Sequence, residues 1–391
     1  MYDEQVVKEA RAIHAELYST EPTTVSYAPG RIEVLGNHTD YNAGTTFSCA
    51  INFGHCFCIS KSNKPGIRVT AGDIRETFEF SATCDEKIDS YWANYVKGNF
   101  YYLATEHGIV IDGIDCTFLG SIPMGAGLSS SAALEVATTY AALQYAGKTI
   151  GEDISKNEIG ILAQKCENVF AGCSCGLLDQ FSSIFGEHHG LIHSDFRTLE
   201  TYTVKLPDDA MFLMINPHIK HKLADSPYNA RRQSCEKAAT ELNELVDYEV
   251  AALRDIQFED FQALKDKIDP EAAQRATHVV WEIHRVEEGV KLLAEGNIEE
   301  FGQFMFDSHE TSRTAFENSI PGLDIVVAAA KEAGALGARL SGGGWGGSVC
   351  ALVKSAEADR ISEEIISACK TKGVEPTIEK IVPSQGAQVI L

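Results

Sequence analysis

The chain has 391 residues and a formal net charge of −23 at neutral pH, from 33 basic and 56 acidic residues. This length exceeds what one hydrophobic core usually supports, and so acidic a surface disfavours nucleic acid and anionic membranes as partners. No apolar stretch approaches the roughly 20 residues that cross a bilayer, the first 18 residues predict a charged amphipathic helix, and the 11 cysteines lack zinc-finger spacing. We therefore expect a two-domain cytoplasmic protein with reduced thiols.

The hydrophobic pattern changes character half-way along the chain. Before residue 218 it predicts, in order, a helix at 3–19, strands at 24–28, 31–36 and 46–60, a hairpin at 67–80, a helix at 91–106, a strand at 114–120, helices at 129–145 and 155–170, and strands at 190–194 and 211–215. Beyond it come long charged helices at 229–246, 273–294, 297–317 and 322–334, strands at 337–341 and 347–354, and a last helix and strand. Strands followed by helices indicate two α+β domains, which we place at 1–205 and 206–391.

The most informative segment is PMGAGLSSSAALEVA at 123–137. Its small residues leave backbone N–H groups bare, and a helix that begins at the serines directs its positive end at whatever occupies the loop, which is typical of a polyphosphate site. The Gly-Lys-Ser/Thr ending of a Walker A motif is absent. A serine in the first helical turn could bind Mg²⁺. Helix capping is the plain alternative, but it needs one serine only and leaves Gly-Ala-Gly unexplained.

Two further segments are rich in glycine. RLSGGGWGGS at 339–348 fits G-x-G-x-x-G, but a strand follows where a dinucleotide fold needs a helix. We interpret it as a hairpin whose backbone approaches a ligand or the other domain, with an ordinary tight hairpin as the alternative. APGRIEVLGNHTDYNAG at 28–44 gathers hydrogen-bonding side chains that suit a polyol. A turn with local Asn and Asp bonds would leave Arg31 and His38 unexplained.

These three segments, in this order, resemble the GHMP kinase superfamily, and PGR-x-E-V-LG-N-HTDYN-x-G is similar to the signature of its galactokinase branch. WANYVKGNFYY (92–102), ENVFAGCSCGLLDQFSSIFG (167–186) and IKHKLADSPYNARRQSC (219–235) extend the resemblance over essentially the whole chain. It implies a two-domain α+β fold with the active site between the domains. It also implies transfer of the γ-phosphate of ATP, with Mg²⁺, to the C1 hydroxyl of α-D-galactose by a monomer whose partners are small molecules.

The resemblance also implies a role for each matching residue. Asp179 corresponds to an aspartate near the anomeric hydroxyl, and Arg31 to an arginine between that aspartate and the γ-phosphate. Whether Asp179 is a general base or only orients the hydroxyl stays open. The implied Mg²⁺ ligands are Ser131 and Glu167. The implied ATP contacts are Trp92, Tyr95, Gly125, Ala126, Gly127, Leu128, Ser129, Ser130 and Ser131. The implied sugar contacts are Asn37, His38, Thr39, Asp40, Gly176 and Tyr228.

One residue departs from the pattern, because the family usually has glutamate where this chain has Asn37. In the family that glutamate contacts the outer hydroxyl, O6, whereas asparagine accepts and also donates hydrogen bonds. A sugar with a C6 carboxylate, such as galacturonate, would then meet no buried negative charge. Two alternatives follow: another sugar 1-kinase, and a non-catalytic sugar and ATP sensor. The intact Ser129–Ala133, Asp179 and Arg31 disfavour the sensor.

Overall fold

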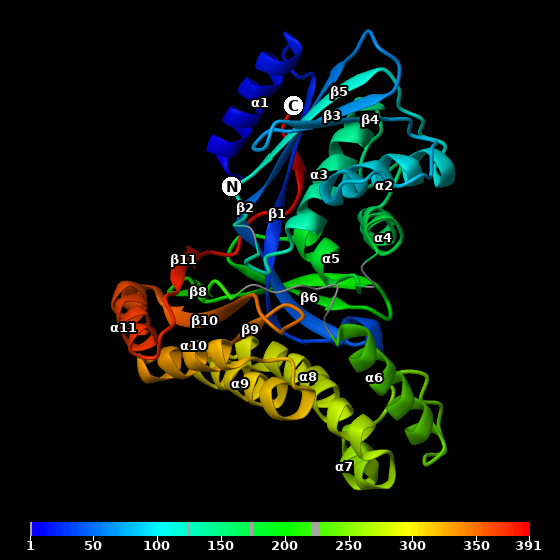
Figure 1. Ribbon diagram of the computed structural model, residues 1–391. Helices are drawn as coiled ribbons and strands as arrows, with labels where there is room; N and C mark the ends of the chain where they lie inside the picture. The colour runs from blue at the N-terminus through cyan, green and yellow to red at the C-terminus, as the bar shows by residue number, and fades with distance from the viewer. Residues whose placement is uncertain (1, 124, 173–174, 220–226) are drawn as a thin grey trace.

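The computed structural model describes residues 2–123, 125–172, 175–219 and 227–391 (Figure 1). The strands are β1 (Thr24–Leu35), β2 (Thr45–Lys61), β3 (Ile67–Ala71), β4 (Glu76–Phe80), β5 (Ile114–Gly120), β6 (Gly190–Asp195), β7 (Glu200–Lys205), β8 (Ala210–Asn216), β9 (Gly337–Ser341), β10 (Ser348–Lys354), β11 (Thr377–Ile381) and β12 (Gln388–Val389). The α-helices are α1 (Glu4–Tyr18), α2 (Tyr91–Glu106), α3 (Ser130–Tyr145), α4 (Lys156–Cys166), α5 (Leu178–Phe185), α6 (Tyr228–Asn243), α7 (Phe258–Leu264), α8 (Pro270–Ala294), α9 (Ile298–Thr311), α10 (Pro321–Glu332) and α11 (Ala358–Thr371). Short helical turns are η1 (Asp40–Asn42), η2 (Glu167–Ala171), η4 (Lys265–Lys267), η5 (Ser312–Phe316) and η6 (Ser355–Glu357).

The first sheet has the strand order β12-β1-β2-β5-β3-β4, and β6 joins β2 and carries β7. The long strand β2 pairs with two different strands along one edge: its first residues pair with β6 and its last residues pair with β5. Most of β1 and β2 is buried on both faces, which fits their nearly continuous apolar sequences. The two long strands run from the upper to the lower part of the molecule and so link its domains (Figure 1).

Helix α3 is the centre of the N-terminal core. It is buried around its whole circumference, since every residue from Ala132 to Leu143 is buried. It packs on β1 and β2 and is flanked by α2, α4 and α5. A hydrogen bond from Ser26 Oγ of β1 to the carbonyl of Ala137, 2.6 Å long, fixes the helix on the sheet. The N-terminus of α3 is thereby held at one place on the sheet.

The second sheet is antiparallel, in the order β11-β8-β10-β9, with α9, α10 and α11 packed against it (Figure 1). The long helix α8 packs on α6 and α9. It starts at a favourable sequence, because Asp269 accepts from the N–H of Ala272 and Pro270 takes the first helical position. Helices α6 and α7 extend the domain to one side (Figure 1). Among the described residues, no helix is both long and apolar enough to cross a membrane.

The predicted elements appear close to their expected positions, with several differences, among them helix α5, which was not predicted. The expected strands 24–28 and 31–36 are one strand, β1, whose register shifts at a bulge between Pro29 and Arg31. The helices expected at 155–170 and 297–317 each end in a π-helical turn, η2 and η5. Strand β7, helix α7 and strand β12 were not predicted. The sheets divide between β7 and β8, near the proposed boundary, but β12 returns to the first sheet beside β1.

Candidate functional site

A buried arginine joins two of the predicted segments. Arg31, on β1, directs Nε and Nη2 at Oδ1 of Asp179 at 2.7 and 2.6 Å, and its Nη1 donates to the carbonyl of Gly127 at 2.8 Å. The side chain of Arg31 is 6% exposed and that of Asp179 is 26% exposed, so one edge of the carboxylate stays accessible. Ser129 Oγ donates to the other oxygen, Oδ2, at 2.5 Å. The arginine therefore connects the carboxylate to the glycine–serine loop, as the sequence predicted.

The glycine–serine loop adopts a conformation that needs its glycines. Gly125 and Gly127 have φ values of +71° and +70°, and Ser129, the residue before α3, has φ +55°. Gly30 of β1 has no side chain where a Cβ would lie 2.4 Å from the carbonyl of Leu128. The absence of a side chain at Gly30 lets the loop lie directly on β1, next to Arg31.

The loop also touches the second glycine-rich segment. A Cβ on Gly127 would lie 3.5 Å from Cα of Gly347, and Ser348 Oγ donates to the carbonyl of Ala126 at 2.7 Å. The hairpin between β9 and β10 is therefore placed against the loop of the other domain, as one of the two sequence interpretations expected.

The three consecutive serines face different partners. Ser129 contacts Asp179, and Ser130 Oγ lies 2.8 Å from Nε2 of His55 on β2. Ser131 Oγ donates to Oε1 of Glu167 at 2.8 Å. Burial, followed by repulsion from Asp179, raises the pKa of Glu167. A cation beside Glu167 would offset both effects.

The Ser131–Glu167 pair has the donor chemistry that Mg²⁺ requires. Magnesium prefers oxygen ligands and is usually held by one or two carboxylates together with substrate phosphates and water. The described part of the chain contains no group of three or more His, Cys, Asp or Glu side chains arranged for a metal. Because substrate phosphates and water complete the usual Mg²⁺ site, one carboxylate and one hydroxyl fit Mg²⁺ that arrives with a nucleotide, and a hydroxyl that donates to Glu167 keeps its lone pairs for the metal.

The loop after β1 presents an aromatic and polar wall. His38, with φ +61°, lies with its Nδ1 2.9 Å from the hydroxyl of Tyr41 and its Nε2 3.0 Å from the carbonyl of Gly343. Burial lowers the pKa of His38 to about 4, so the ring is neutral at pH 7. Because a carbonyl only accepts, the proton lies on Nε2. The ring of Tyr228 lies 5.1 Å from that of His38.

Asp40 and Gly176 meet at the same place. A Cβ on Gly176 would lie 1.7 Å from Oδ2 of Asp40, so the backbone can approach the carboxyl only because residue 176 is glycine. Burial, with repulsion from Glu33 as the next cause, raises the pKa of Asp40 to about 7. Groups that donate hydrogen bonds to this carboxyl, as sugar hydroxyls do, would therefore stabilise its charged form.

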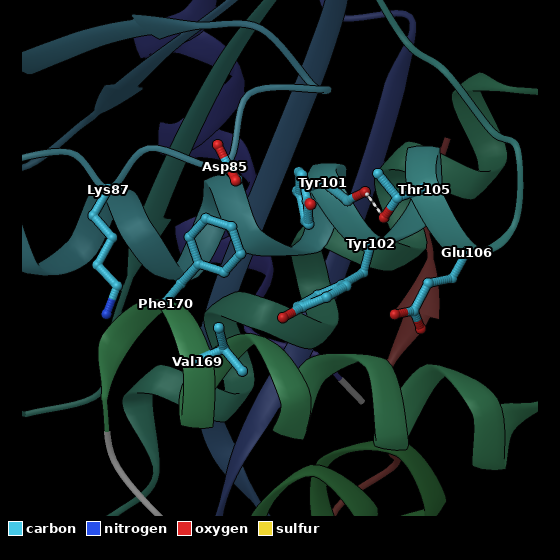
Figure 2. Close-up of a pocket in the computed structure, with 8 residues that line it drawn as sticks. All are labelled: Asp85, Lys87, Tyr101, Tyr102, Thr105, Glu106, Val169 and Phe170. Carbon is cyan, nitrogen blue, oxygen red and sulfur yellow. Dashed lines mark hydrogen bonds between the residues drawn. The ribbon is translucent and has the colours of Figure 1, made fainter.

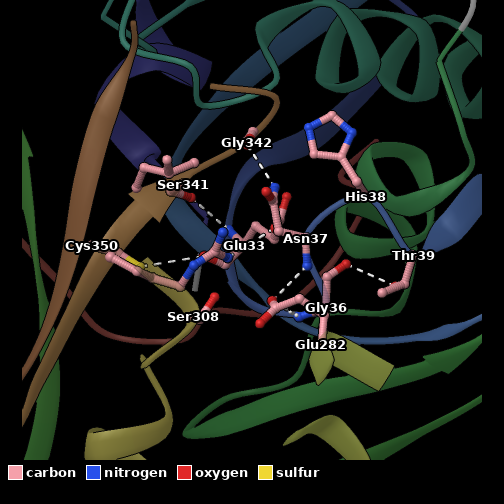
Figure 3. Close-up of polar contacts among 12 residues, drawn as sticks. Glu33, Gly36, Asn37, His38, Thr39, Glu282, Ser308, Ser341, Gly342 and Cys350 are labelled. Atoms are coloured by element: carbon pink, nitrogen blue, oxygen red, sulfur yellow. Dashed lines mark hydrogen bonds and ion pairs between the residues drawn. The ribbon is translucent and has the colours of Figure 1, made fainter. Parts of the chain in front are cut away.

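Thr39 and Asn37 are already bonded within the protein. Oγ1 of Thr39 lies 2.8 and 2.7 Å from the carbonyls of Gly36 and Thr45, and the residue is fully buried (Figure 3). The amide of Asn37 donates to Glu33 Oε1 at 2.8 Å and to the carbonyl of Gly342 at 2.9 Å. Its oxygen lies 2.9 Å from Asn318 Nδ2 and 3.3 Å from His278 Nε2. The structure thus directs neither side chain to a ligand.

A buried charged network lies beneath this loop. Arg339, fully buried on β9, donates to Glu33 Oε1 at 2.9 Å. On the other side, Glu282 accepts from the backbone N–H groups of Gly36 and Asn37, both at 2.9 Å (Figure 3). Burial opposes the charge of Glu282, but Arg285, His278 and Arg339 together with the N–H of Asn37 outweigh it and lower the pKa to about 2. Sequence reasoning missed this network. The available signal was a charged residue inside each apolar strand, Glu33 and Arg339.

The two residues expected beside adenine differ in exposure. Trp92 is half-buried at the start of α2, where Nε1 donates to Glu76 Oε2 at 2.6 Å. Tyr95 is 2% exposed, belongs to the hydrophobic core and donates to the hydroxyl of Tyr91. Of the two, only Trp92 is partly exposed, with its ring near those of Phe78 and Phe118, whereas Tyr95 supports the helix from inside.

A separate cavity of about 520 Å³ lies between the second half of α2 and η2, with Tyr101, Tyr102 and Phe170 on its walls (Figure 2). None of the residues expected at the site lines it. The predicted site is instead formed by loops from β1, β5 and β9 and by the starts of α3 and α5.

Three family models match this chain. The model of the GHMP kinases N terminal domain matches residues 94–187, GHMP kinases C terminal matches 290–371, and the galactokinase galactose-binding signature matches 12–61. A galactokinase of Pasteurella multocida (strain Pm70) is 36% identical over 388 residues, which are 97% of this chain and 98% of the relative. The chain belongs to the galactokinase family of GHMP kinases.

Other comparisons agree with this galactokinase family membership. A galactokinase of Haemophilus influenzae (strain PittGG) is 36% identical over 394 residues, covering 98% of this chain and 99% of the relative. The crystal structure of Lactococcus lactis galactokinase complexed with galactose superposes with a TM-score of 0.88 at 30% identity, covering 98% and 99% of the two chains. The expected GHMP kinase fold and its assignment to ATP-dependent sugar kinases are confirmed.

Proposed function

We propose that this member of the galactokinase family transfers the γ-phosphoryl group of ATP to the C1 hydroxyl of α-D-galactose, giving galactose 1-phosphate and ADP. The observation that carries this proposal is the position of Arg31, which contacts both Asp179 and the carbonyl of Gly127 in the glycine–serine loop. The galactose-binding signature over 12–61 and a relative solved as a complex with galactose support the choice of sugar.

In this proposal Asp179 orients the C1 hydroxyl and accepts its proton as the O–P bond forms. Phosphoryl transfer needs positioning and charge neutralisation more than covalent chemistry. Arg31 supplies positive charge at the transferred group while it holds Asp179 in place. Donors of the glycine–serine loop and the start of α3 bind the phosphates. Ser131 and Glu167 hold Mg²⁺, which supplies further positive charge to the phosphates when bound.

The sugar-binding wall is proposed to consist of His38, Asp40, Gly176 and Tyr228. Asp40 accepts from two sugar hydroxyls, and the absent side chain at Gly176 lets the Asp40 carboxyl keep this position in the wall. The amides of Asn37 and the hydroxyl of Thr39 fix the shape of this wall through the contacts described above. Trp92 covers one face of the adenine.

The direct test is a coupled ADP-release assay with Mg²⁺-ATP and a panel of galactose, galacturonate, N-acetylgalactosamine, arabinose and glucose. We expect the highest kcat/KM with galactose and no ADP release above background without sugar. Galactose turnover close to that of glucose would contradict the proposal. Binding of galactose and ATP without any turnover would instead identify a sugar and ATP sensor.

Another sugar 1-kinase activity is favoured by one observation, the uncharged side chain of Asn37 in the sugar loop. No acidic side chain at this position repels a C6 carboxylate, so galacturonate is the competing substrate. In this alternative, Asn37→Glu raises the ratio of kcat/KM for galactose to that for galacturonate. An unchanged ratio would remove Asn37 as a selectivity residue, in agreement with its four hydrogen bonds inside the protein.

We also expect the enzyme to act in the cytoplasm as a monomer, with sugar and ATP as its only partners. The acidic charge of −23 supports the absence of nucleic-acid and anionic membrane partners. Size-exclusion chromatography with light scattering checks the monomer, for which a mass near 42.6 kDa is expected.

A further inference from the structure

Gln180 holds its amide between two buried carboxylates. It follows Asp179 in the first turn of α5 and is fully buried. Its Nε2 lies 2.8 Å from Oε2 of Glu167 and 3.3 Å from Oε2 of Glu135. One amide nitrogen has two protons, so each carboxylate receives one. The structure thus places the amide nitrogen, and not its oxygen, against both carboxyl groups.

Gln180 completes the support of Glu167. Oε1 of Glu167 receives the hydroxyl proton of Ser131, and Oε2 receives the amide of Gln180. With a donor on each oxygen, the carboxylate cannot rotate without breaking a buried hydrogen bond. Glu135, four residues after Ser131 on α3, holds the amide from its other side. The contact therefore connects α3, η2 and α5 at the pair of residues proposed for Mg²⁺.

Two consecutive residues of α5 serve two parts of the site. Asp179 is bound to Arg31 and Ser129, on the side of the sugar and the γ-phosphate. Gln180 points about 100° around the helix and reaches Glu167. One helical turn thus sets the position of the sugar-side carboxylate and of the metal-side carboxylate together.

We infer that Gln180 is a positioning residue that sets the geometry of the Ser131–Glu167 pair and, through it, the affinity for Mg²⁺ in the presence of nucleotide. The inference rests on the proposed function, because it takes Ser131 and Glu167 as the metal pair. Groups that orient metal ligands without touching the metal typically change its affinity by about 10- to 100-fold.

The test compares Gln180→Met with Gln274→Met. Gln274 on α8 provides the control, because its amide nitrogen likewise has two acceptors, the carbonyl of Thr314 and a carboxylate oxygen of Glu317, and neither belongs to the proposed metal pair. Mg²⁺ is titrated into enzyme with ADP by calorimetry, and galactose binding is measured without nucleotide. We expect Gln180→Met to bind Mg²⁺ about 10-fold more weakly or worse, with unchanged galactose affinity and with kcat recovered by excess Mg²⁺. Gln274→Met should match the wild type in each assay.

Glu135→Leu provides a second route in case Gln180→Met does not fold. It nearly keeps the size of the side chain but removes the oxygen that accepts from the amide of Gln180, so Mg²⁺ binding should weaken in the same direction. Wild-type Mg²⁺ affinity in a folded Gln180→Met, or in a folded Glu135→Leu, overturns the inference. If the wild type fails to phosphorylate galactose but Gln180→Met still loses Mg²⁺ affinity, the proposed sugar is wrong and the positioning role stands.

Discussion

Arg31→Lys keeps the positive charge at the centre of the site but removes the planar guanidinium fork, which contacts Asp179 and the glycine–serine loop at the same time. Arg31 makes three short contacts, at 2.6 and 2.7 Å to Asp179 and at 2.8 Å to the carbonyl of Gly127. The lysine side chain is shorter and ends in a single ammonium group, so it can replace about one of these three contacts. Hydrogen bonds to charged groups contribute about 1.5–3 kcal/mol each, so the loss of two amounts to roughly 3–6 kcal/mol.

The lower part of this range applies here, because Asp179 is 26% exposed and solvent weakens the pair. At 1.36 kcal/mol per factor of ten, kcat/KM for galactose should fall by about 10²- to 10³-fold. Initial rates of ADP release over a matrix of galactose and ATP concentrations measure this loss. Galactose binding by calorimetry without nucleotide and thermal unfolding show whether the variant remains folded and still binds sugar.

Arg68→Lys is the matched control. Arg68 donates through Nε to Asp115 at 2.8 Å on the first sheet, in a pair of similar chemistry away from the proposed site. This variant should keep kcat/KM within about twofold of the wild type, since neither Arg68 nor Asp115 is among the residues proposed to bind sugar, ATP or Mg²⁺. A similar loss of activity in both variants, or a loss below about threefold in Arg31→Lys, would refute the reasoning about the fork.

Three further predictions concern the sugar and adenine sides. Because the raised pKa of Asp40, about 7 against 3.8, keeps a proton on the folded protein that the unfolded chain releases, the free energy of unfolding should fall from about pH 4 to pH 7. Asp40→Asn should remove this slope in urea titrations; an unchanged slope assigns it elsewhere. Gly176→Ala, whose Cβ would lie 1.7 Å from Asp40 Oδ2, should weaken galactose binding about tenfold or more in calorimetry, and unchanged affinity would contradict the proposed sugar contact. Trp92→Ala should raise KM for ATP roughly three- to tenfold and leave KM for galactose unchanged, whereas equal changes in both would indicate a structural role.

Sequence periodicity located the elements with strong local patterns. The helix at 91–106 and the strand at 114–120 coincide with α2 and β5. Strand β7 escaped because its exposed and half-buried side chains follow no apolar run, and β12 has two residues only. The bulge after Pro29 was taken for a break between two strands, since local signals do not show that β2 pairs on both sides of it.

The sequence likewise predicted one part of the candidate site and missed another. The contact of Arg31 with Asp179 was expected from the resemblance, although 148 residues separate the two. The buried partners Glu282, Asn318 and Arg339 were missed because they come from α8, the loop after η5 and β9, which lie 245 to 306 residues after the residues that they contact. Nothing in their local patterns shows which loop they support. Only the packing of the two domains brings them together.

The ion pair between Glu33 and Arg339 also limits how the enzyme can move. It joins β1 of one domain to β9 of the other. Two hydrogen bonds add to this connection: the N–H of Glu33 donates to Ser341 Oγ, and Cys350 Sγ donates to the carbonyl of Glu33. Hinge rotation that separates these strands would leave a charged group buried without its partner, at a cost of about 3–5 kcal/mol. We therefore expect the two domains to resist separation along this seam, and substrate exchange and product release to use motions of the surrounding loops.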